Sequence, residues 1–518
     1  MRWAIAGGGV AVILAVVLIF FYLLWVVIPL FLPADIRPVE ERVIPGWEDS
    51  SARLLSVEEQ QEVGLRLSDA GDIMFCNVPR GEGLRTERLP LDEGDGVVLA
   101  TNAVDAFGHV AAASGSGDVL VFRHQYETRF PGGVETREIV PELTFPYGET
   151  PLLNMPSGDL AGLALSDTDE GLLLAAADRS GLVRINAGEK SANFLTGEVT
   201  LEPNIRETRV EFTVTGLAVS GDHRWLYLGD DTGLVHRFSV PALELQQTIA
   251  VSESAISAMV MLLGGISLLT GDQDGGIQQL FTVRGADGDR SLELIRRFDG
   301  LGAPIIRLLP EERRKGFVAL TASNELGFFH STAKRLVARL SLAQLQPDEI
   351  ALSPRADSLL AVSGERLGHL EIHNEHPEVS FSSLWRKVWY ENYSEPAYIW
   401  QSSAANNEFE PKFSLTPLVF GTIKAAAYAM LFAIPLALMG AAYTAYFMSP
   451  ELRKWVKPGI EIMAALPTVI LGFLAGLWFA PWVEEHLVDL FTMLLLVPPG
   501  LLAFSWGWHR FFSNRDDP

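Results

Sequence analysis

Hydrophobic and polar positions follow three different patterns along the chain. Residues 4–32 form one unbroken apolar run, long enough to cross a bilayer and about twice the length of a secretory signal's apolar core. From Asp35 to about Glu410, short alternating runs separated by Gly, Asp and Ser predict β-strands and turns. Beyond Leu415 long apolar runs return. We expect an uncleaved N-terminal membrane anchor rather than a cleaved signal peptide, an all-β middle region and a C-terminal helical membrane region.

The middle region repeats one unit: an apolar strand, a strand of small residues, a turn centred on glycine, and an alternating strand. Successive turn glycines are 41 to 64 residues apart. A four-stranded propeller blade takes about 40–45 residues, and longer spacings accommodate insertions. We therefore predict a seven-bladed β-propeller, similar in architecture to the WD40 class but without its Trp-Asp dipeptide; a two-sheet sandwich is the alternative. The predicted turn glycines are Gly71, Gly117, Gly181, Gly233, Gly276, Gly327 and Gly368.

The C-terminal region contains three predicted spans, at about 415–448, 460–482 and 490–508. The connection between the first two is basic, whereas the connection after the second is acidic. Loops rich in Lys and Arg remain in the cytoplasm, so the same rule places the middle region outside the cytoplasm. The basic connection contains Arg453, Lys454 and Lys457, and the acidic one contains Glu484, Glu485 and Asp489.

The same region carries a family resemblance. The stretches FGTIKAAAYAMLFAIPLALMGAAYTAYFM and KPGIEIMAALPTVILGFLAGL resemble the permease subunits of ATP-driven phosphate importers, in the long variant with a large extracytoplasmic domain. The aromatic stretches at 385–403 and 409–418 fit that variant too. The loop by which such permeases bind their ATPase is absent, which leads us to expect a permease truncated before that loop or completed by further sequence.

These patterns predict a mixed fold of four parts: an N-terminal transmembrane anchor at 1–34, an all-β periplasmic propeller at 35–380, an aromatic linker at 381–412, and three helices at 413–518, which the resemblance implies are the start of a permease core. The linker admits two interpretations, an interfacial segment at the membrane surface and a packed connection. The expected location is the bacterial inner membrane, crossed several times.

The resemblance implies transport of inorganic phosphate, with a second permease subunit, a cytoplasmic ATPase subunit and a periplasmic phosphate-binding protein as partners. ATP would be bound by the partner ATPase, because this chain has no phosphate-cradling GxxxxGK[ST] loop and needs no cofactor of its own. The lipid bilayer is the remaining partner.

Candidate residues of the substrate path are polar groups within or beside the apolar spans. Lys424 is a cation inside an apolar span, where it can either meet an anionic substrate or extend to the interface. Glu461 can pair with Lys457 one turn earlier. The other candidates are Thr422, Thr444 and Thr468 on the path, Pro435 and Pro467 as helix kinks, and Arg453 and Lys454 with Lys457 and Glu461 in a cytoplasmic hinge.

Composition narrows the remaining possibilities. A net charge of −24 argues against a nucleic-acid partner, and the single cysteine, Cys76, excludes an intrachain disulfide. No catalytic motif is present, so we expect a transport subunit and not an enzyme. No metal site is predicted either. His369, Glu371, His373 and His376 form the best metal candidate but are better explained as an exposed strand, and Asp272 with Asp274 as a turn.

A second function class fits part of the pattern. A membrane-anchored β-propeller that binds a partner, with no transport role, would also combine an N-terminal helix with a large extracytoplasmic domain. It would leave the three C-terminal spans and Lys424 unexplained, so the transport interpretation is preferred.

Overall fold

The computed structural model describes residues 2–47, 50–92, 94–104, 108–133, 137–156, 158–192, 199–285, 287–403, 409–465 and 468–511. The chain divides into two compact units, Met1–Phe420 and Gly421–Pro518, which are described separately. Pro467, a predicted helix kink, lies outside the described residues.

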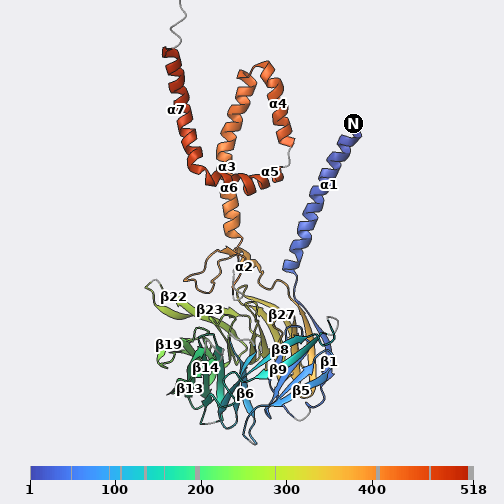
Figure 1. The fold of residues 1–518 in the computed structure, drawn as a ribbon, viewed down its shortest axis with the longest axis vertical. Coiled ribbons are helices and arrows are strands. Elements are labelled where there is room, and N and C mark those ends of the chain that lie inside the picture. Colours follow the sequence, from blue (N-terminus) through green and yellow to red (C-terminus); the bar gives the residue numbers. More distant parts are fainter. Residues whose placement is uncertain are drawn as a thin grey trace, which may run out of the picture. The chain divides into compact units, whose positions relative to one another are not determined.

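The first unit contains a seven-bladed β-propeller, which confirms the predicted fold class and excludes the two-sheet sandwich (Figure 1). In the described residues, seven antiparallel sheets of four or five strands follow one another along the chain. The first strand of the first blade, β2 (Ala52–Val57), contacts both β6 (Val97–Asn102) of the second blade and β28 (Glu349–Leu352) of the seventh, which closes the ring.

The strands follow the chain blade by blade. Blade 1 continues with β3 (Val63–Ser68), β4 (Asp72–Asn77) and β5 (Glu82–Arg88). Blade 2 continues with β7 (His109–Ser114), β8 (Asp118–Arg129), β9 (Glu138–Thr144) and β10 (Leu153–Asn154). Blade 3 contains β11 (Leu160–Asp167), β12 (Gly171–Asp178), β13 (Leu182–Ala192), β14 (Val199–Glu202) and β15 (Ile205–Arg209). Blade 4 contains β16 (Val214–Val219), β17 (Trp225–Asp230), β18 (Leu234–Ser239) and β19 (Leu245–Ala250).

The remaining blades are four-stranded. Blade 5 contains β20 (Ile256–Met261), β21 (Ser267–Asp272), β22 (Ile277–Arg284) and β23 (Arg290–Phe298). Blade 6 contains β24 (Ile305–Pro310), β25 (Gly316–Thr321), β26 (Glu325–His330) and β27 (Arg335–Ser341). Blade 7 contains β28, β29 (Ser358–Ser363), β30 (Arg366–His373) and the N-terminal strand β1 (Asp35–Val43).

Strand β1 completes the last blade. It pairs antiparallel with β30, with Asp35 opposite His373 and Val43 opposite Arg366. The outer strand of blade 7 therefore comes from the opposite end of the propeller sequence, and this pairing covers an edge that would otherwise be open. It also places Asp35, the first residue of the propeller, beside His373, the last residue of β30.

The turns between the second and third strands were predicted with partial success. Gly71, Gly117, Gly181 and Gly233 have positive φ angles of 85°, 95°, 89° and 85°, as a tight turn requires. In blades 5 to 7 the prediction was wrong, because the positive φ belongs to Gly275, Asn324 and Gly364 instead of Gly276, Gly327 and Gly368. Gly327 and Gly368 lie inside strands and have no positive φ angle. At these two positions glycine fits the repeated unit because it is small.

A polar residue at the end of the second strand stabilises these turns. In blade 2, Ser114 Oγ accepts a hydrogen bond of 3.1 Å from the backbone N–H of Asp118, four residues later. Five other blades repeat this bond with a Ser, Asp or Thr acceptor: Ser68, Asp178, Asp230, Asp272 and Thr321. The Asp272 region is thus a turn, as predicted.

The hydrophobic core lies between adjacent blades. One cluster joins Leu173 and Ala175 of blade 3 to Val214 and Leu226 of blade 4. Second strands contain runs of alanine, such as Ala175–Ala177, all fully buried. Their small side chains let neighbouring sheets pack closely around the ring.

The helices flank the propeller sequence. Helix α1 (Arg2–Val27) precedes the 3-10 helix Ile28–Phe31, and α2 (Phe381–Trp385) follows blade 7. The long α3 (Thr416–Ala442) continues as the π-helix Tyr443–Phe447, and then come α4 (Pro450–Ala465), α5 (Thr468–Leu474), the π-helix Ala475–Phe479, α6 (Ala480–Glu485) and α7 (Leu487–Phe511). By length and composition, three described helical stretches can cross a membrane: Ile13–Leu30, Thr416–Phe447 and Leu487–Arg510.

One expectation about the C-terminal region changes. The predicted hinge loop is helical, because Arg453, Lys454, Lys457 and Glu461 all lie on α4. In the described residues, the predicted span at 460–482 includes the end of α4, then α5, the π-helix Ala475–Phe479 and the start of α6. Pro450 begins α4 at the first helical position, where its missing N–H costs no hydrogen bond, and Pro458 lies inside the helix.

Candidate functional site

The segment between the propeller and α3 is held by buried charges. We call Val379–Leu415, without residues 404–408, the docked segment. Glu391, in its middle, forms an ion pair of 2.6 Å with Lys315 Nζ, and the two residues are only 7% and 1% exposed. Ser267 Oγ donates to the other oxygen of Glu391 at 2.6 Å. Because Lys315 precedes β25 and Ser267 begins β21, one carboxylate ties the docked segment to blades 5 and 6.

A second set of bonds surrounds this pair. Arg296, on β23, donates to Gln279 Oε1 at 2.8 Å and to the backbone oxygen of Trp389. Glu410 accepts hydrogen bonds from the Thr332 hydroxyl and, at 2.9 Å, from the backbone N–H of Glu391. Burial, followed by the charge of Glu391, raises the pKa of Glu410, and burial lowers the pKa of Arg296. Buried charges of this kind persist only when their partners stay in place.

The ends of the docked segment are fixed as well. Arg335 donates to the backbone oxygen of Val379 at 3.2 Å, and Ser380 Oγ donates to that of Ala333 at 3.1 Å. At the other end, Leu415 N–H donates to Leu384 O at 2.8 Å, one residue before α3 begins. The sequence left two interpretations of the linker open. On the side that faces the propeller, the linker is a packed connection.

Sequence reasoning missed this network. Glu391 and Glu410 stand among aromatic residues, in the stretches WYENY and FEPKF. Charged residues flanked on both sides by large rings are a local signal of buried ion pairs, but their partners, Lys315 and Arg296, lie far away in the sequence.

The predicted path residues on α3 do not share one face. Thr422 and Lys424 are two positions apart, which is about 200° around an α-helix, so they point to different sides. Lys424 Nζ lies 5.8 Å from the ring centre of Tyr428, one turn on, and Thr444 Oγ1 donates to Gly440 O at 2.8 Å within its own helix. Pro435 lies inside α3, which continues past it, and Thr468 begins α5.

The basic residues of α4 have distinct surroundings. Arg453 donates to the backbone oxygens of Ala445 at 2.8 Å and Met448 at 3.2 Å, which caps the carbonyl end of the preceding helix. The described side chains of Lys457 and Glu461 do not form the predicted ion pair. Arg453 therefore has a structural contact, and Lys454 and Lys457 are exposed.

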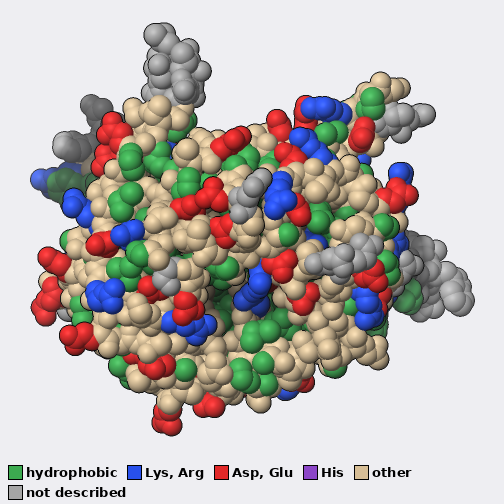
Figure 2. Space-filling view, turned by 90° about the horizontal axis from the view of Figure 1, so that it is seen from below, with side chains coloured by type: hydrophobic (Ala, Val, Ile, Leu, Met, Phe, Trp, Pro, Cys, Tyr) green, Lys and Arg blue, Asp and Glu red, His purple; other side chains and the backbone are tan. Residues whose placement is uncertain are grey.

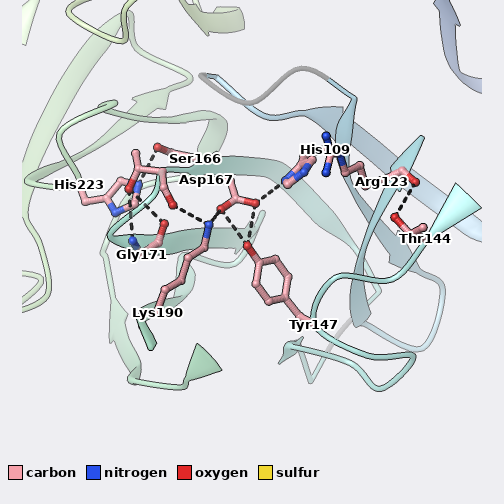
Figure 3. A network of polar contacts seen from close by, with 10 residues as sticks. His109, Arg123, Thr144, Tyr147, Ser166, Asp167, Gly171, Lys190 and His223 are labelled. Carbon is pink, nitrogen blue, oxygen red and sulfur yellow. Dashed lines mark hydrogen bonds and ion pairs between the residues drawn. The ribbon is translucent and has the colours of Figure 1, made fainter. Parts of the chain in front are cut away.

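A polar network within the propeller joins blades 2 and 3 (Figure 3). Asp167, at the end of β11, pairs with His109 Nδ1 and Lys190 Nζ and accepts from the Tyr147 hydroxyl at 2.9 Å. Burial opposes its ionisation, but the hydrogen bonds from His109, Lys190 and Tyr147 prevail and lower the pKa of Asp167. The donors all converge on this one carboxylate, so the network holds two blades together.

A cavity of about 650 Å³ adjoins this network between blades 3 and 4. Its lining includes Lys190 and His223, but four acidic residues outnumber them: Asp169, Glu170, Glu189 and Asp222. An acidic lining repels anions, so this cavity is not suited to phosphate.

Metal ligation finds no support among the described residues, where no group of three potential ligands converges. His369, Glu371 and His373 occupy one face of β30, as expected, but His373 is 4.0 Å from Glu371 and His376 instead approaches Glu378 at 3.5 Å.

Comparisons with known proteins add one functional indication. No family model matches the chain. The probable ABC transporter permease protein YqgH of Bacillus subtilis (strain 168) is 26% identical over 76 residues. This is a partial similarity to a transporter permease. The match covers 15% of this chain and 25% of the relative, so the chain spans about a quarter of the length of the curated relative it matches.

Two solved structures are similar to part of the chain. The Cps50 (Swd1) β-propeller domain of Myceliophteria thermophila is 12% identical, covers 65% of this chain and 99% of its own, and has a TM-score of 0.44. A chain of the Mitotic Checkpoint Complex is 17% identical, with coverages of 65% and 96% and a TM-score of 0.43. The fold assignment rests on the strand pairing described above.

Proposed function

We propose that this chain is a membrane subunit of an ATP-driven importer and that its substrate is inorganic phosphate. The observation that carries the proposal is the partial similarity to an ABC transporter permease, together with helices long and apolar enough to cross a membrane. A second permease subunit, a cytoplasmic ATPase and a solute-binding protein would complete the transporter. The chain itself would have no enzymatic activity.

In this proposal α3 supplies part of the translocation path. Lys424 places a positive charge within an apolar helix, where charge is costly and is retained mainly for function. Its ammonium group would attract an anion entering from outside, and the Tyr428 ring beneath it would orient the side chain. Thr422, Thr444 and Thr468 would offer hydroxyl groups along the path, and Pro435 and Pro467 would allow bending between two states.

The function is tested by an in-frame deletion of residues 421–511 at the native locus, followed by measurement of radiolabelled phosphate uptake in whole cells. We expect uptake through this system to be lost while the propeller is still produced and exported. Competition with sulfate and phosphonate distinguishes phosphate from related anions. Normal uptake by the deletion strain would contradict the proposal and favour a membrane-anchored binding propeller without a transport role.

Lys424 provides a sharper test. Lys424→Met keeps the side-chain length, removes the charge and lowers an insertion cost of up to about 2.5–3.5 kcal/mol. We expect unchanged or higher protein levels with at least a tenfold fall in phosphate uptake, and Lys424→Arg, which keeps the charge, to retain more activity. If Lys424→Met transports at the normal rate, the lysine only extends to the interface.

A further inference from the structure

The docked segment also exposes four aromatic side chains. Phe381 is 72% exposed and Trp385 is 42% exposed, and Tyr398 and Trp400 are exposed to a similar degree. The inner side of the same segment is held by the buried charges of Glu391 and Glu410. We call Phe381, Trp385, Tyr398 and Trp400 the aromatic collar. A soluble surface rarely presents four large rings on so short a stretch without a partner.

The collar lies where the chain turns toward its apolar helices. Trp400 pairs with Phe413 across the short strands Trp400–Gln401 and Lys412–Phe413, and their rings are 5.9 Å apart. Leu384, beside Trp385, accepts the hydrogen bond from Leu415. Helix α3 begins at Thr416, and its apolar stretch begins at the same residue. The collar is therefore attached by backbone bonds to the residues at which a membrane-crossing stretch starts.

The N-terminal helix reaches the propeller on the same side. In an antiparallel blade, the turns joining strands one to two and three to four lie at one edge; we call the surface that they form the docking face. Lys315 and Ala333, which hold the docked segment, are in such turns of blade 6. Asp35 pairs with His373 at the corresponding edge of blade 7, and four residues from Phe31 can span only about 14 Å.

The composition of the collar fits a lipid surface better than a protein partner. Two exposed cations, Arg386 and Lys387, stand among the rings, and Lys387 Nζ lies 5.9 Å from the ring centre of Tyr398. Rings with a polar edge favour the headgroup layer, and cations beside them can bind lipid phosphates. The acidic residue nearest to them in the sequence, Glu391, is buried in its pair with Lys315, and the nearest exposed one is Glu395. The face turned away from α2 instead carries acidic and basic side chains dispersed among apolar ones (Figure 2).

We propose that the aromatic collar inserts into the headgroup layer of the outer leaflet and holds the docking face of the propeller against the membrane. The two tethers, at β1 and at α3, bring this face to the bilayer, and the collar makes the contact. This inference requires the apolar helices to be in a membrane, but it does not require the chain to transport anything.

The test uses the full-length chain in phospholipid liposomes, with single cysteines labelled by a nitroxide. Cys76 is fully buried and burial raises its pKa to about 12, so it should not react in the folded protein. The labelled positions are Phe381→Cys, Trp385→Cys and Trp400→Cys. The controls are Asp231→Cys, in an exposed turn of blade 4 on the opposite face, and Leu431→Cys, inside the apolar stretch of α3.

Electron paramagnetic resonance then compares collisions with oxygen, which dissolves in lipid, and with a water-soluble nickel chelate. We expect the oxygen-to-nickel ratio at two or more collar positions to exceed that of Asp231→Cys several-fold and to approach that of Leu431→Cys. Ratios equal to the Asp231 control would overturn the proposal. So would protection from both reagents, which would indicate a protein partner instead of lipid.

Folding is checked within the same samples. A variant that takes up two labels has exposed Cys76 and is misfolded, and Tyr398→Cys then replaces it in the comparison. The liposomes contain no ATPase, binding protein or phosphate. A negative result therefore contradicts the proposed lipid contact and says nothing about the proposed transport function.

Discussion

At the scale of single residues, buried charges determine where the docked segment sits. Lys315 and Glu391 are removed from water, and each is stabilised by the other and by the bonds to Ser267 and to the backbone oxygen of Leu263. Taking such ions out of water costs several kcal/mol each, so the pair contributes specificity more than stability. Loss of one partner leaves the other charge buried without compensation.

Lys315→Met should therefore destabilise the propeller by about 3–5 kcal/mol, as measured by urea unfolding of the full chain in detergent. Arg313→Met is the matched control, because Arg313 forms an exposed pair with Glu59 and should cost less than about 1 kcal/mol. The double variant Lys315→Met, Glu391→Met should recover most of the loss. Equal effects of the two single substitutions would contradict the buried-pair interpretation.

Two buried histidines should make the propeller sensitive to acid. Burial lowers the pKa of His330 to about 3 and that of His124 to about 4. His330 Nδ1 also accepts the backbone N–H of Ala333 at 3.3 Å, which requires that nitrogen to be unprotonated. The unfolded chain binds protons near pH 6.5 and the folded chain does not, so these groups contribute stability above about pH 6.5 that is lost as pH falls toward 3.

The check is the urea midpoint of the wild type and of His330→Gln at pH 7.5 and pH 5. Wild-type stability should fall by up to about 1.4 kcal/mol per pH unit for each histidine, and the variant should fall by less. His373→Gln, at an exposed position, controls for the removal of a histidine. Parallel pH dependence of wild type and His330→Gln would show that His330 is not the group responsible.

At the scale of elements, the closure of the ring depends on β1. The strand covers the edge of β30, and its Ile36 packs against the cluster shared by blades 6 and 7. A ring closed by its first strand has no free edge at the junction of its two ends. The same strand follows the N-terminal apolar helix within a few residues, so that helix and the closure of the ring are linked by one short stretch.

Replacement of Asp35–Val43 by a Gly-Ser chain of equal length should cost roughly 2–4 kcal/mol through lost strand hydrogen bonds and burial. Urea unfolding and proteolysis within blade 7 measure the effect. The same replacement in β14 (Val199–Glu202), an exposed outer strand of blade 3, is the control and should change little. If both replacements are equally harmful, strand loss in general is responsible and ring closure is not.

At the scale of the whole molecule, charge and hydropathy lead to an expectation about the membrane topology of the chain. The propeller lies between two apolar stretches, Ile13–Leu30 and Thr416–Phe447. The basic residues Arg453, Lys454 and Lys457 follow the second stretch on α4. Lys and Arg near the end of a span favour the cytoplasmic side, so the propeller is expected on the other side.

Cysteine labelling of intact spheroplasts tests this arrangement. Asp231→Cys on the propeller should react with a membrane-impermeant maleimide, whereas Lys454→Cys on α4 should react only after permeabilisation. The buried Cys76 of the parent chain provides the background. Protection of Asp231→Cys in intact cells, with labelling after permeabilisation, would place the propeller inside and overturn the topology.

Local properties of the sequence determined the main parts of the fold. Apolar runs, alternation of period two and recurrent turn residues are all readable over a few residues, and they predicted the long helices and the seven blades. The same signals located four of the turn glycines correctly. They failed in blades 5 to 7, because Asn324 also adopts a positive φ and several adjacent residues satisfied the same pattern.

Only the tertiary structure decided the contacts between distant residues. Asp35 meets His373, Lys315 meets Glu391, and Asp167 meets His109 because the ring brings these positions together. No local pattern identifies the partner of a buried charge, since the energy that retains it arises only when both groups have left water. Likewise, the aromatic residues at 381–413 were visible in the sequence, but packing alone separated those that hold the segment to the propeller from those that face outward.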